Sequence, residues 1–331
     1  MPTHYINNSF AFHPKIRKFR LFNMDVSIII VNYNTKKLIE NCIQSIYDKT
    51  TGIDFEIIVV DNASRDGSQE IIKTKFKNIK LIELNENIGF GRANNEGIKV
   101  ASGKNIFFLN PDTILLNNSI KILSEFLDQN SGIGACGGNL YTKDLKPNFS
   151  FMPFFPTLLP ELNLLSGNLI YTFFVGKNYK FNYTGKPIEV AYITGADMMI
   201  TRKCLSVTGP FDTDFFMYYE ETELSLRIKK SGYKIYSVPD AKIIHYEGGS
   251  FSYSEDSQRF SLVSRSIFMK KAKKGYIYRF LSDSIYFTIC LVGMLRAKVK
   301  NNSKNYNFWL FSFKEFRKMI TSSNFSSLHR A

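Results

Sequence analysis

The sequence predicts an α/β fold: a single Rossmann-like domain with a mostly parallel sheet, followed by a helical, basic C-terminal extension. Three observations predict it. Apolar, β-branched runs of strand length alternate with segments whose apolar residues recur at helical spacing. Each of the first four runs is followed by polar residues. The surplus of Lys and Arg behind the formal net charge of +14 lies at the two ends of the chain.

The first half of the chain repeats one β-α unit. Strands are expected at 26–31, 55–60, 79–84 and 106–109. The helices between and after them are indicated by apolar residues at helical spacing: Leu38, Ile39, Cys42, Ile43, Ile46 and Tyr47; Ile71, Ile72 and Phe76; Phe90, Ala93, Gly97, Ile98 and Ala101; Ile120, Leu123, Phe126 and Leu127. Strands that alternate with helices of this length imply a parallel sheet with right-handed crossovers.

The second half is less regular. Further strands are expected at 133–141, 188–199, 233–238 and 242–245, and a helix before Gly232, a residue type that commonly ends helices. The aromatic segment 149–174 has two interpretations, ordinary core or a lid over a ligand site, and core is the commoner fate of aromatic residues.

Charge separates the ends of the chain from its body. Residues 1–24 carry four basic residues and no acid, and we expect a flexible basic arm there, with Met24 as a conceivable alternative start. Residues 265–331 carry fourteen basic and two acidic residues, whereas 25–264 carry 25 basic and 27 acidic. A slightly acidic body argues against nucleic acid as a partner. The four cysteines form no Cys-x-x-Cys pair, which fits a reduced, cytoplasmic chain.

Polar residues at the strand ends indicate a small-molecule site. They are Asn32 and Asn34, Asp61, Asn85 and Asn87, and Asn110 and Asp112. Because the carboxyl ends of parallel strands meet at one edge of a sheet, where open α/β folds bind ligands, we expect these side chains to converge. Asp112 is the leading candidate for the centre of the site. Alternatively, 110–112 is only a turn, since Asn, Pro and Asp all favour turns.

Two later features add candidates. Glu220, Glu221 and Glu223 form the most acidic cluster, at the expected start of a helix, where the helix dipole alone favours acids. His245 follows a short strand and precedes glycines, a setting suited to metal or phosphate contact, although a lone histidine is more often structural.

The motifs in this order resemble the family-2 inverting glycosyltransferases with the A-type fold, particularly the rhamnosyltransferase-like branch. They are VSIIIVNYN (26–34), VVDNAS (59–64), NIGF (87–90), NPD (110–112), TGA (194–196), EE (220–221) and His245. Each is weak alone, but their order and spacing are specific, and the resemblance covers 25–252. It implies a nucleotide-diphospho-sugar transferase domain at 25–252, with 253–331 as the C-terminal extension.

The resemblance also implies roles on the donor side. Asp61 would contact the base or ribose of a nucleotide-diphosphate sugar, beside Asn32 and Asn34, with Asn87 and Asn110 also on the donor side. Asp112 would hold Mg²⁺ or Mn²⁺ at the donor diphosphate, with His245 close to that metal. A hard cation with oxygen ligands suits a departing diphosphate. This sequence has Asn110 where the paired aspartates of the family's metal motif have their first acid.

On the acceptor side, the resemblance implies one carboxylate as general base. Glu221 occupies that position and Glu220 is its neighbour, but the usual Glu-Asp pair is Glu-Glu here, so the choice between them stays open. Gly195, Ala196 and Asp197 would lie near the acceptor or the sugar.

The extension beyond the resemblance suits a membrane surface. A helix is expected over 255–274, and the apolar stretch 276–295 is interrupted by Arg279, Ser282 and Asp283. We expect no stretch to reach the roughly 20 residues that span a bilayer as a helix. A basic, apolar helix favours peripheral association with an anionic surface, although a helix packed on the body is the alternative.

The resulting hypothesis is an inverting transferase that moves a sugar, rhamnose by the resemblance to that branch, to a lipid-linked glycan acceptor. It would work on the cytoplasmic face of the inner membrane, in O-antigen, capsule or similar polysaccharide biosynthesis. Two alternatives are a nucleotidyltransferase and a catalytically inactive glycan-binding scaffold. The first would usually need a glycine-rich phosphate loop after the first strand, which Asn32-Tyr33-Asn34-Thr35 is not.

Overall fold

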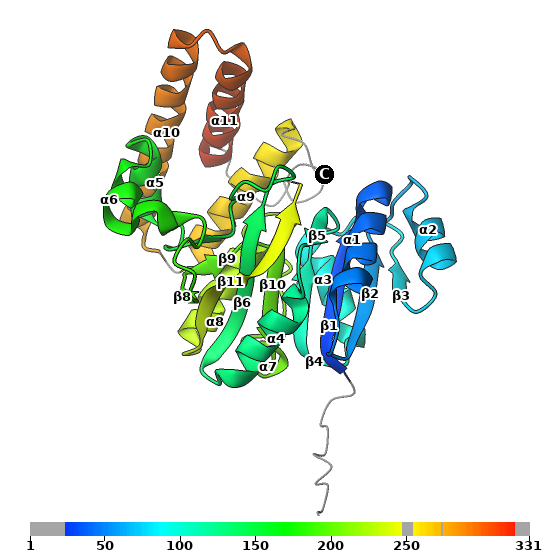
Figure 1. Ribbon diagram of the computed structural model, residues 1–331. Coiled ribbons are helices and arrows are strands. Elements are labelled where there is room, and N and C mark those ends of the chain that lie inside the picture. Colours follow the sequence, from blue (N-terminus) through cyan, green and yellow to red (C-terminus); the bar gives the residue numbers. More distant parts are fainter. Residues whose placement is uncertain (1–23, 247–253, 273, 322–331) are drawn as a thin grey trace, which may run out of the picture.

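The computed structural model describes residues 24–246, 254–272 and 274–321. The expected basic arm, apart from Met24, and the glycines after His245 lie outside the described residues. A central sheet with helices on both faces forms the body, and the last helices stand to one side of it (Figure 1).

The first half alternates strands and helices as predicted. The strands are β1 Met24–Asn32, β2 Phe55–Asp61, β3 Lys80–Glu83 and β4 Gly103–Leu109; the helices are α1 Lys36–Lys49, α2 Ser68–Lys75, α3 Phe90–Val100 and α4 Ser119–Gln129. The four strands pair in parallel in the order β3-β2-β1-β4. Their carboxyl ends therefore share one edge.

The second half of the sheet is mixed. Its strands are β5 Thr113–Leu115, β6 Ile133–Tyr141, β8 Ile188–Glu189, β10 Asp197–Thr201 and β11 Lys234–His245. β10 runs antiparallel to both β4 and β6, and β11 runs parallel to β6 but antiparallel to β5 and β8. The strand order is β3-β2-β1-β4-β10-β6-β11-β5, with β8 beside β11. The mostly parallel α/β sheet is confirmed.

Three expectations in this half need correction. The expected strand at 188–199 is broken: β9 Tyr192–Ile193 leaves the main sheet to pair with β7 Phe151–Met152, and 194–196 turn before β10 begins. The two strands expected at 233–238 and 242–245 form the single strand β11, whose register with β6 shifts around Pro239 because proline has no N–H to donate. Between β10 and β11 lie the helices α7 Arg202–Thr208 and α8 Glu220–Lys230, of which α7 was not expected.

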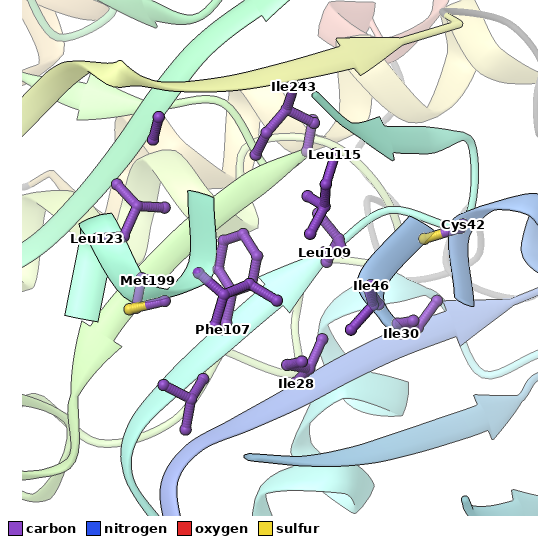
Figure 2. Packing of buried hydrophobic residues seen from close by; sticks show 14 of the residues in the cluster. Ile28, Ile30, Cys42, Ile46, Phe107, Leu109, Leu115, Leu123, Met199 and Ile243 are labelled. Carbon is purple, nitrogen blue, oxygen red and sulfur yellow. The ribbon is translucent and has the colours of Figure 1, made fainter. Parts of the chain in front are cut away.

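The sheet is buried on both faces, as parallel sheets with crossover helices are. Ile28 and Ile30 of β1 point to one face, where they pack with Phe107, Met199 and the helices α1 and α4 (Figure 2). Ile29 and Val31 point to the other face, towards α3 and α8. The β-branched run that predicted β1 therefore fills two cores at once.

The aromatic segment divides between the two interpretations. It contains α5 Leu158–Leu165, α6 Leu169–Val175 and a 3-10 turn at Gly176–Tyr179. Phe151 and Tyr171 are fully buried, as the core interpretation predicts. Phe173 and Phe174 are not: 84% and 70% of their surface is exposed. The core prediction is wrong for these two residues, because none of the described helices and strands covers α6 on that side.

Three helices make up the C-terminal extension: α9 Glu255–Lys271, α10 Tyr276–Val299 and α11 Ser303–Thr321. They surround a third core that includes Leu262, Phe268 and Phe316 and that also takes in Phe215 from the body. Arg265 of α9 is buried and bonds to Glu161 of α5 and to Asp283 of α10. The extension is thus joined to the body by apolar packing and by a buried ion-pair network.

The length of α10 corrects the expectation that no segment is long enough to cross a bilayer. It has 24 residues, and an 18-residue stretch of it has a mean hydropathy of 1.4, which meets the length and composition of a spanning helix. The helix remains intact through Arg279, Ser282 and Asp283 because Ser282 and Asp283 join the Arg265 network.

Candidate active site

A pocket of about 310 Å³ lies at the carboxyl edge of the sheet. It is open to solvent and brings together the ends of β1, β2, β3, β4 and β11 with the start of α8. Eight of the residues predicted for the site line it: Asn87, Asn110, Asp112, Gly195, Ala196, Glu220, Glu221 and His245. The predicted convergence of the strand ends is therefore observed.

Asn32 and Asp61 lie behind this lining. They are opposite each other in the pairing of β1 with β2, and the Asn32 amide donates to Asp61 Oδ2 at 2.6 Å. The other oxygen of Asp61 accepts from the backbone N–H of Ser64 and from the Gln69 amide. Both side chains are fully buried, so their direct effect is to fix the turn after β2.

Asn34 is exposed and belongs to the same turn system. It adopts a φ of +53°, a conformation that asparagine tolerates better than most residues. Its backbone N–H donates to Ser64 Oγ, and its side chain accepts from the N–H of Arg65. The loops after β1 and β2 are in this way held together.

Asp112 and His245 meet although they are far apart in the sequence. β5 pairs with the end of β11, which sets His245 opposite Thr113, next to Asp112. His245 Nε2 lies 3.3 Å from Asp112 Oδ1. That contact is within ion-pair distance but is not a hydrogen bond, and among the described residues Asp112 Oδ1, Asn110 Oδ1 and His245 Nδ1 are buried without a hydrogen-bond partner. Buried polar atoms without partners are costly, so this group is suited to a ligand that supplies the partner.

The two glutamates stand at the start of α8. The preceding residues Tyr218 and Tyr219 both have φ near +70°, which turns the chain sharply into the helix. Ser264 of α9 donates to the carbonyl of Met217, and the carbonyl of Phe216 accepts from the N–H of Phe90. The loop Phe215 to Tyr219 is therefore held from two sides, and with it the position of Glu220 and Glu221.

Burial raises the pKa of both glutamates. For Glu220 the pKa lies well above 4.5, because the side chain is buried and the charge of Glu221 is close by. The pKa of Glu221 is raised by burial, while the hydroxyl of Thr222 donates to its Oε1 at 3.0 Å and opposes the shift. Two adjacent buried carboxyls cannot both ionise easily, and the pKa of Glu220 is raised further than that of Glu221.

Gly195 and Ala196 line the pocket, but Asp197 does not. A Cβ on Gly195 would contact Glu221 and Phe90, so a larger residue there would narrow the space beside the carboxylates. Asp197 is fully buried in the sheet, where its Oδ2 accepts from the N–H of Gly138 and burial raises its pKa well above the usual value. Its observed contacts support β6 and β10.

Several lining residues were missing from the predicted set. They include Tyr33, Asn62, Phe90, Thr194, Met217 and Tyr218. Asn62 donates to Asn87 Oδ1 at 2.7 Å and accepts from the N–H of Ile88, so it joins the ends of β2 and β3. Tyr33 and Asn62 directly follow Asn32 and Asp61, and the alternation of side chains along a strand is the signal that could have found them.

Gly89 illustrates how tightly the pocket wall is built. It has a φ of +89°, and a Cβ there would overlap the carbonyl oxygen of Phe216. We expect Gly89→Ala to push the Phe215 to Tyr219 loop away from α3 and to lower stability by about 1 to 3 kcal/mol, the usual cost of such strain. Thermal unfolding would measure it.

The matched control is Gly132→Ala, because Gly132 has no atom within 4 Å of a Cβ and no positive φ. If Gly89→Ala unfolded at the temperature of Gly132→Ala and of the wild type, the loop contact would carry no weight in the fold.

Fold and site together define the class of this protein: a glycosyltransferase with the A-type fold. The chain belongs to glycosyl transferase family 2, whose family model matches residues 27–204. The family expected from the motifs is confirmed.

Two named relatives are also glycosyltransferases. The chain is 29% identical over 266 residues to the low-salt glycan biosynthesis hexosyltransferase Agl10 of Haloferax volcanii, covering 74% of this chain and 77% of the relative. It is 23% identical over 244 residues to an N-acetylglucosaminyl-diphospho-decaprenol L-rhamnosyltransferase of Mycobacterium tuberculosis, covering 67% and 76%.

A solved structure has the same fold. The mannosyltransferase PcManGT from Pyrobaculum calidifontis, in complex with GDP-Man and Mn²⁺, aligns over 93% of this chain and 86% of its own, with a TM-score of 0.54 and 16% identity. The similarity extends through most of the chain, including much of what lies beyond the family match.

Proposed function

We propose that this glycosyltransferase moves a sugar from a nucleotide-diphosphate donor to a glycan acceptor with inversion at the anomeric carbon. The observation that carries the proposal is one pocket holding both Glu220-Glu221 and the Asn110, Asp112 and His245 group. The first set would supply a base, and the second would hold a cation that stabilises the leaving diphosphate, which are the two functions that displacement of a nucleoside diphosphate requires.

Glu221 is the proposed general base. It would accept the proton of the acceptor hydroxyl while that oxygen forms a bond to the anomeric carbon, and the bond from that carbon to the diphosphate oxygen breaks on the opposite face. Glu220, whose pKa is raised by burial and by the charge of Glu221, would stay neutral beside it and avoid a second buried charge. Gly195 and Ala196 leave room for the sugar or the acceptor next to Glu221.

On the donor side, Asn110, Asp112 and His245 fit a divalent cation, Mg²⁺ or Mn²⁺. Their partnerless buried atoms are one oxygen from each of the first two and a nitrogen from the third. Among the described residues no group of three or more His, Cys, Asp or Glu could hold a metal ion, which fits an ion shared with substrate phosphates rather than a full protein cage. When bound, the cation would neutralise charge on the departing diphosphate.

The base and ribose are proposed to lie over the turns after β1 and β2. Asn32 and Asp61 would act by holding these turns in place, with Asn34 on the exposed rim. Tyr33, Asn62 and Asn87 offer an aromatic face and amide groups on the pocket side. The buried network explains why residues of this type stand at 32 and 61 even though they do not line the pocket.

The names of two relatives support a narrower version. One is a hexosyltransferase of glycan biosynthesis, and the other is an L-rhamnosyltransferase acting on a diphospho-decaprenol-linked sugar. We propose rhamnose or a related hexose as the donor sugar and a lipid-linked glycan as the acceptor, in O-antigen, capsule or other surface polysaccharide biosynthesis.

A lipid-linked acceptor requires access to a membrane, and we propose that residues 253–331 provide it. The chain would then lie peripherally on the cytoplasmic face of the inner membrane. The basic surplus of 265–331 supports this proposal.

A panel of nucleotide-sugars tests the proposed reaction. The purified full chain is incubated with each donor and Mg²⁺ or Mn²⁺, with and without a membrane extract containing lipid-linked glycans, and release of nucleoside diphosphate is followed. Thermal stabilisation by each nucleotide with metal is recorded in parallel. We expect one donor to be turned over. If no donor were consumed and no nucleotide raised the unfolding temperature, the donor site would be wrongly assigned.

The raised pKa of Glu221 predicts the pH dependence. A general base must be ionised, so kcat/KM falls as pH decreases through the pKa of Glu221, and burial moves this acid limb above 4.5. A pH profile of nucleoside diphosphate release measures it. Glu220→Gln should retain the limb. If instead Glu220→Gln removed the limb and the activity, Glu220 would be the base.

A further inference from the structure

The solvent-facing side of α10 is as apolar as a surface that is normally buried. Its exposed large side chains are Tyr276, Ile277, Phe280, Leu281, Leu291, Leu295 and Val299, which run along the whole helix. Two hydroxyl residues interrupt this face, Ser284 and Thr288, and both donate to the carbonyl four residues earlier. Such bonds satisfy the hydroxyl within the helix, so this face requires few hydrogen bonds from its surroundings.

The exposed side of α6 has the same character. Leu169, Phe173 and Phe174 each have 70% or more of their surface exposed, and the exposed Thr172 donates its hydroxyl to the carbonyl of Asn168. α6 meets α5 at an angle of 117°, and together they are apolar enough to pass for a broken membrane segment. This pair belongs to the insertion between β7 and β8, not to the C-terminal extension.

α5 fixes this pair against α10. The N–H of Leu158 donates to the hydroxyl of Tyr278, and the Glu161 carboxylate accepts from Ser282 and from Arg265. Figure 1 shows α5 and α6 beside α10, away from the sheet. α5 thus joins the two helices that carry the apolar faces.

Charge identifies what could cover it. Residues 276–321 hold eight Lys or Arg and only two acids, Asp283 and Glu315, which are paired with Arg265 and Arg259. The exposed basic side chains are Arg296, Lys298, Lys300, Lys304, Lys314, Arg317 and Lys318. A second copy of the chain would bring like charges together, whereas an anionic bilayer offers both acyl chains and negative headgroups.

We propose that α6 and α10 form a single bilayer-binding face, with Phe173 and Phe174 inserted at the boundary between headgroups and acyl chains of an anionic membrane. This extends the proposed membrane association, on which it rests, from the C-terminal residues to an insertion of the catalytic region. The buried Arg265 network on the inner side of α10 favours a helix lying in the interface over one crossing the hydrocarbon.

Vesicle sedimentation tests this assignment. The full chain is mixed with phosphatidylcholine vesicles, with or without phosphatidylglycerol, and the double variant Phe173→Ser/Phe174→Ser is compared with Val207→Ser. Val207 is 60% exposed and belongs to α7, which lies at the opposite end of the body from α6 and α10 (Figure 1). We expect binding to the anionic vesicles, reduced on the order of tenfold or more by the double change, since each phenylalanine loses an apolar contact. Val207→Ser should bind like the wild type.

The outcomes separate three proposals. A wild type that fails to bind vesicles overturns the membrane association altogether, while donor turnover in solution still tests the reaction. A double variant that binds like the wild type overturns only the part played by α6. If the double variant instead changed the molecular mass measured by light scattering and left vesicle binding intact, the face would be a contact between copies.

A second measurement gives the depth of α6 in the bilayer. Trp309 is the single tryptophan of the chain. In a Trp309→Phe background, Phe174→Trp should be quenched by phospholipids brominated near the headgroup end of the acyl chain. An unquenched Trp at 174 in a vesicle-bound protein would contradict insertion of α6.

Discussion

Replacing Glu221 with glutamine is expected to abolish sugar transfer while donor binding persists. The amide keeps the size of the side chain and can still pair with Thr222, but it cannot accept a proton from the acceptor hydroxyl. Loss of a general base costs about 10²- to 10⁴-fold in rate. The measurement is kcat for nucleoside diphosphate release in the presence of acceptor, together with the affinity for the donor.

Glu125→Gln is the matched control, because Glu125 is an exposed carboxylate on α4, away from the pocket. The same chemical change there should leave kcat unaltered. If Glu221→Gln retained wild-type kcat with an unchanged pH profile, Glu221 would not be the base.

Asp112→Asn should have an effect of comparable size through the donor. It removes the one carboxylate of the proposed metal group while preserving shape. Stabilisation of a departing diphosphate by a cation is worth several kcal/mol, so the loss should be about 10²- to 10³-fold at roughly 1.4 kcal/mol for each factor of ten. Thermal stabilisation by nucleoside diphosphate with Mn²⁺ should fall in parallel, and chelation with EDTA should bring the wild type to the level of the variant.

Asp144→Asn, in an exposed turn, controls for the change of charge. If Mn²⁺ with nucleoside diphosphate stabilised Asp112→Asn as strongly as Asp144→Asn, Asp112 would not bind the metal, whatever the activity of the variant.

Local pattern predicted the first half of the fold because its strands are buried on both faces. A continuous β-branched run such as that in β1 has few other stable arrangements, and parallel pairing then brings the strand ends together. The candidate residues at the ends of β3 and β4, Asn87 and Asp112, follow from that topology alone.

The second half depended on contacts that no local pattern contains. His245 reaches Asp112 only because β5 turns back to pair with β11. The reversed direction of β10 could not be inferred from its residues, since antiparallel and parallel strands buried on both faces have similar composition. Contacts between strands also determine whether a polar residue faces the pocket or lies behind it. Asn32 donates a hydrogen bond to Asp61, and the residues that follow them, Tyr33 and Asn62, line the pocket instead.

Because α9 supports the Phe215 to Tyr219 loop, the C-terminal helices cannot be treated as a domain separate from the active site. The family match ends at residue 204, before Glu220, and the loop that aims Glu220 and Glu221 packs through Tyr219 on Phe268. A chain trimmed at 252 would keep every residue proposed to touch substrate and still lose the support beneath the proposed base. A chimera that exchanges acceptor specificity between relatives should therefore transfer the segment after 204 together with the C-terminal helices that support it.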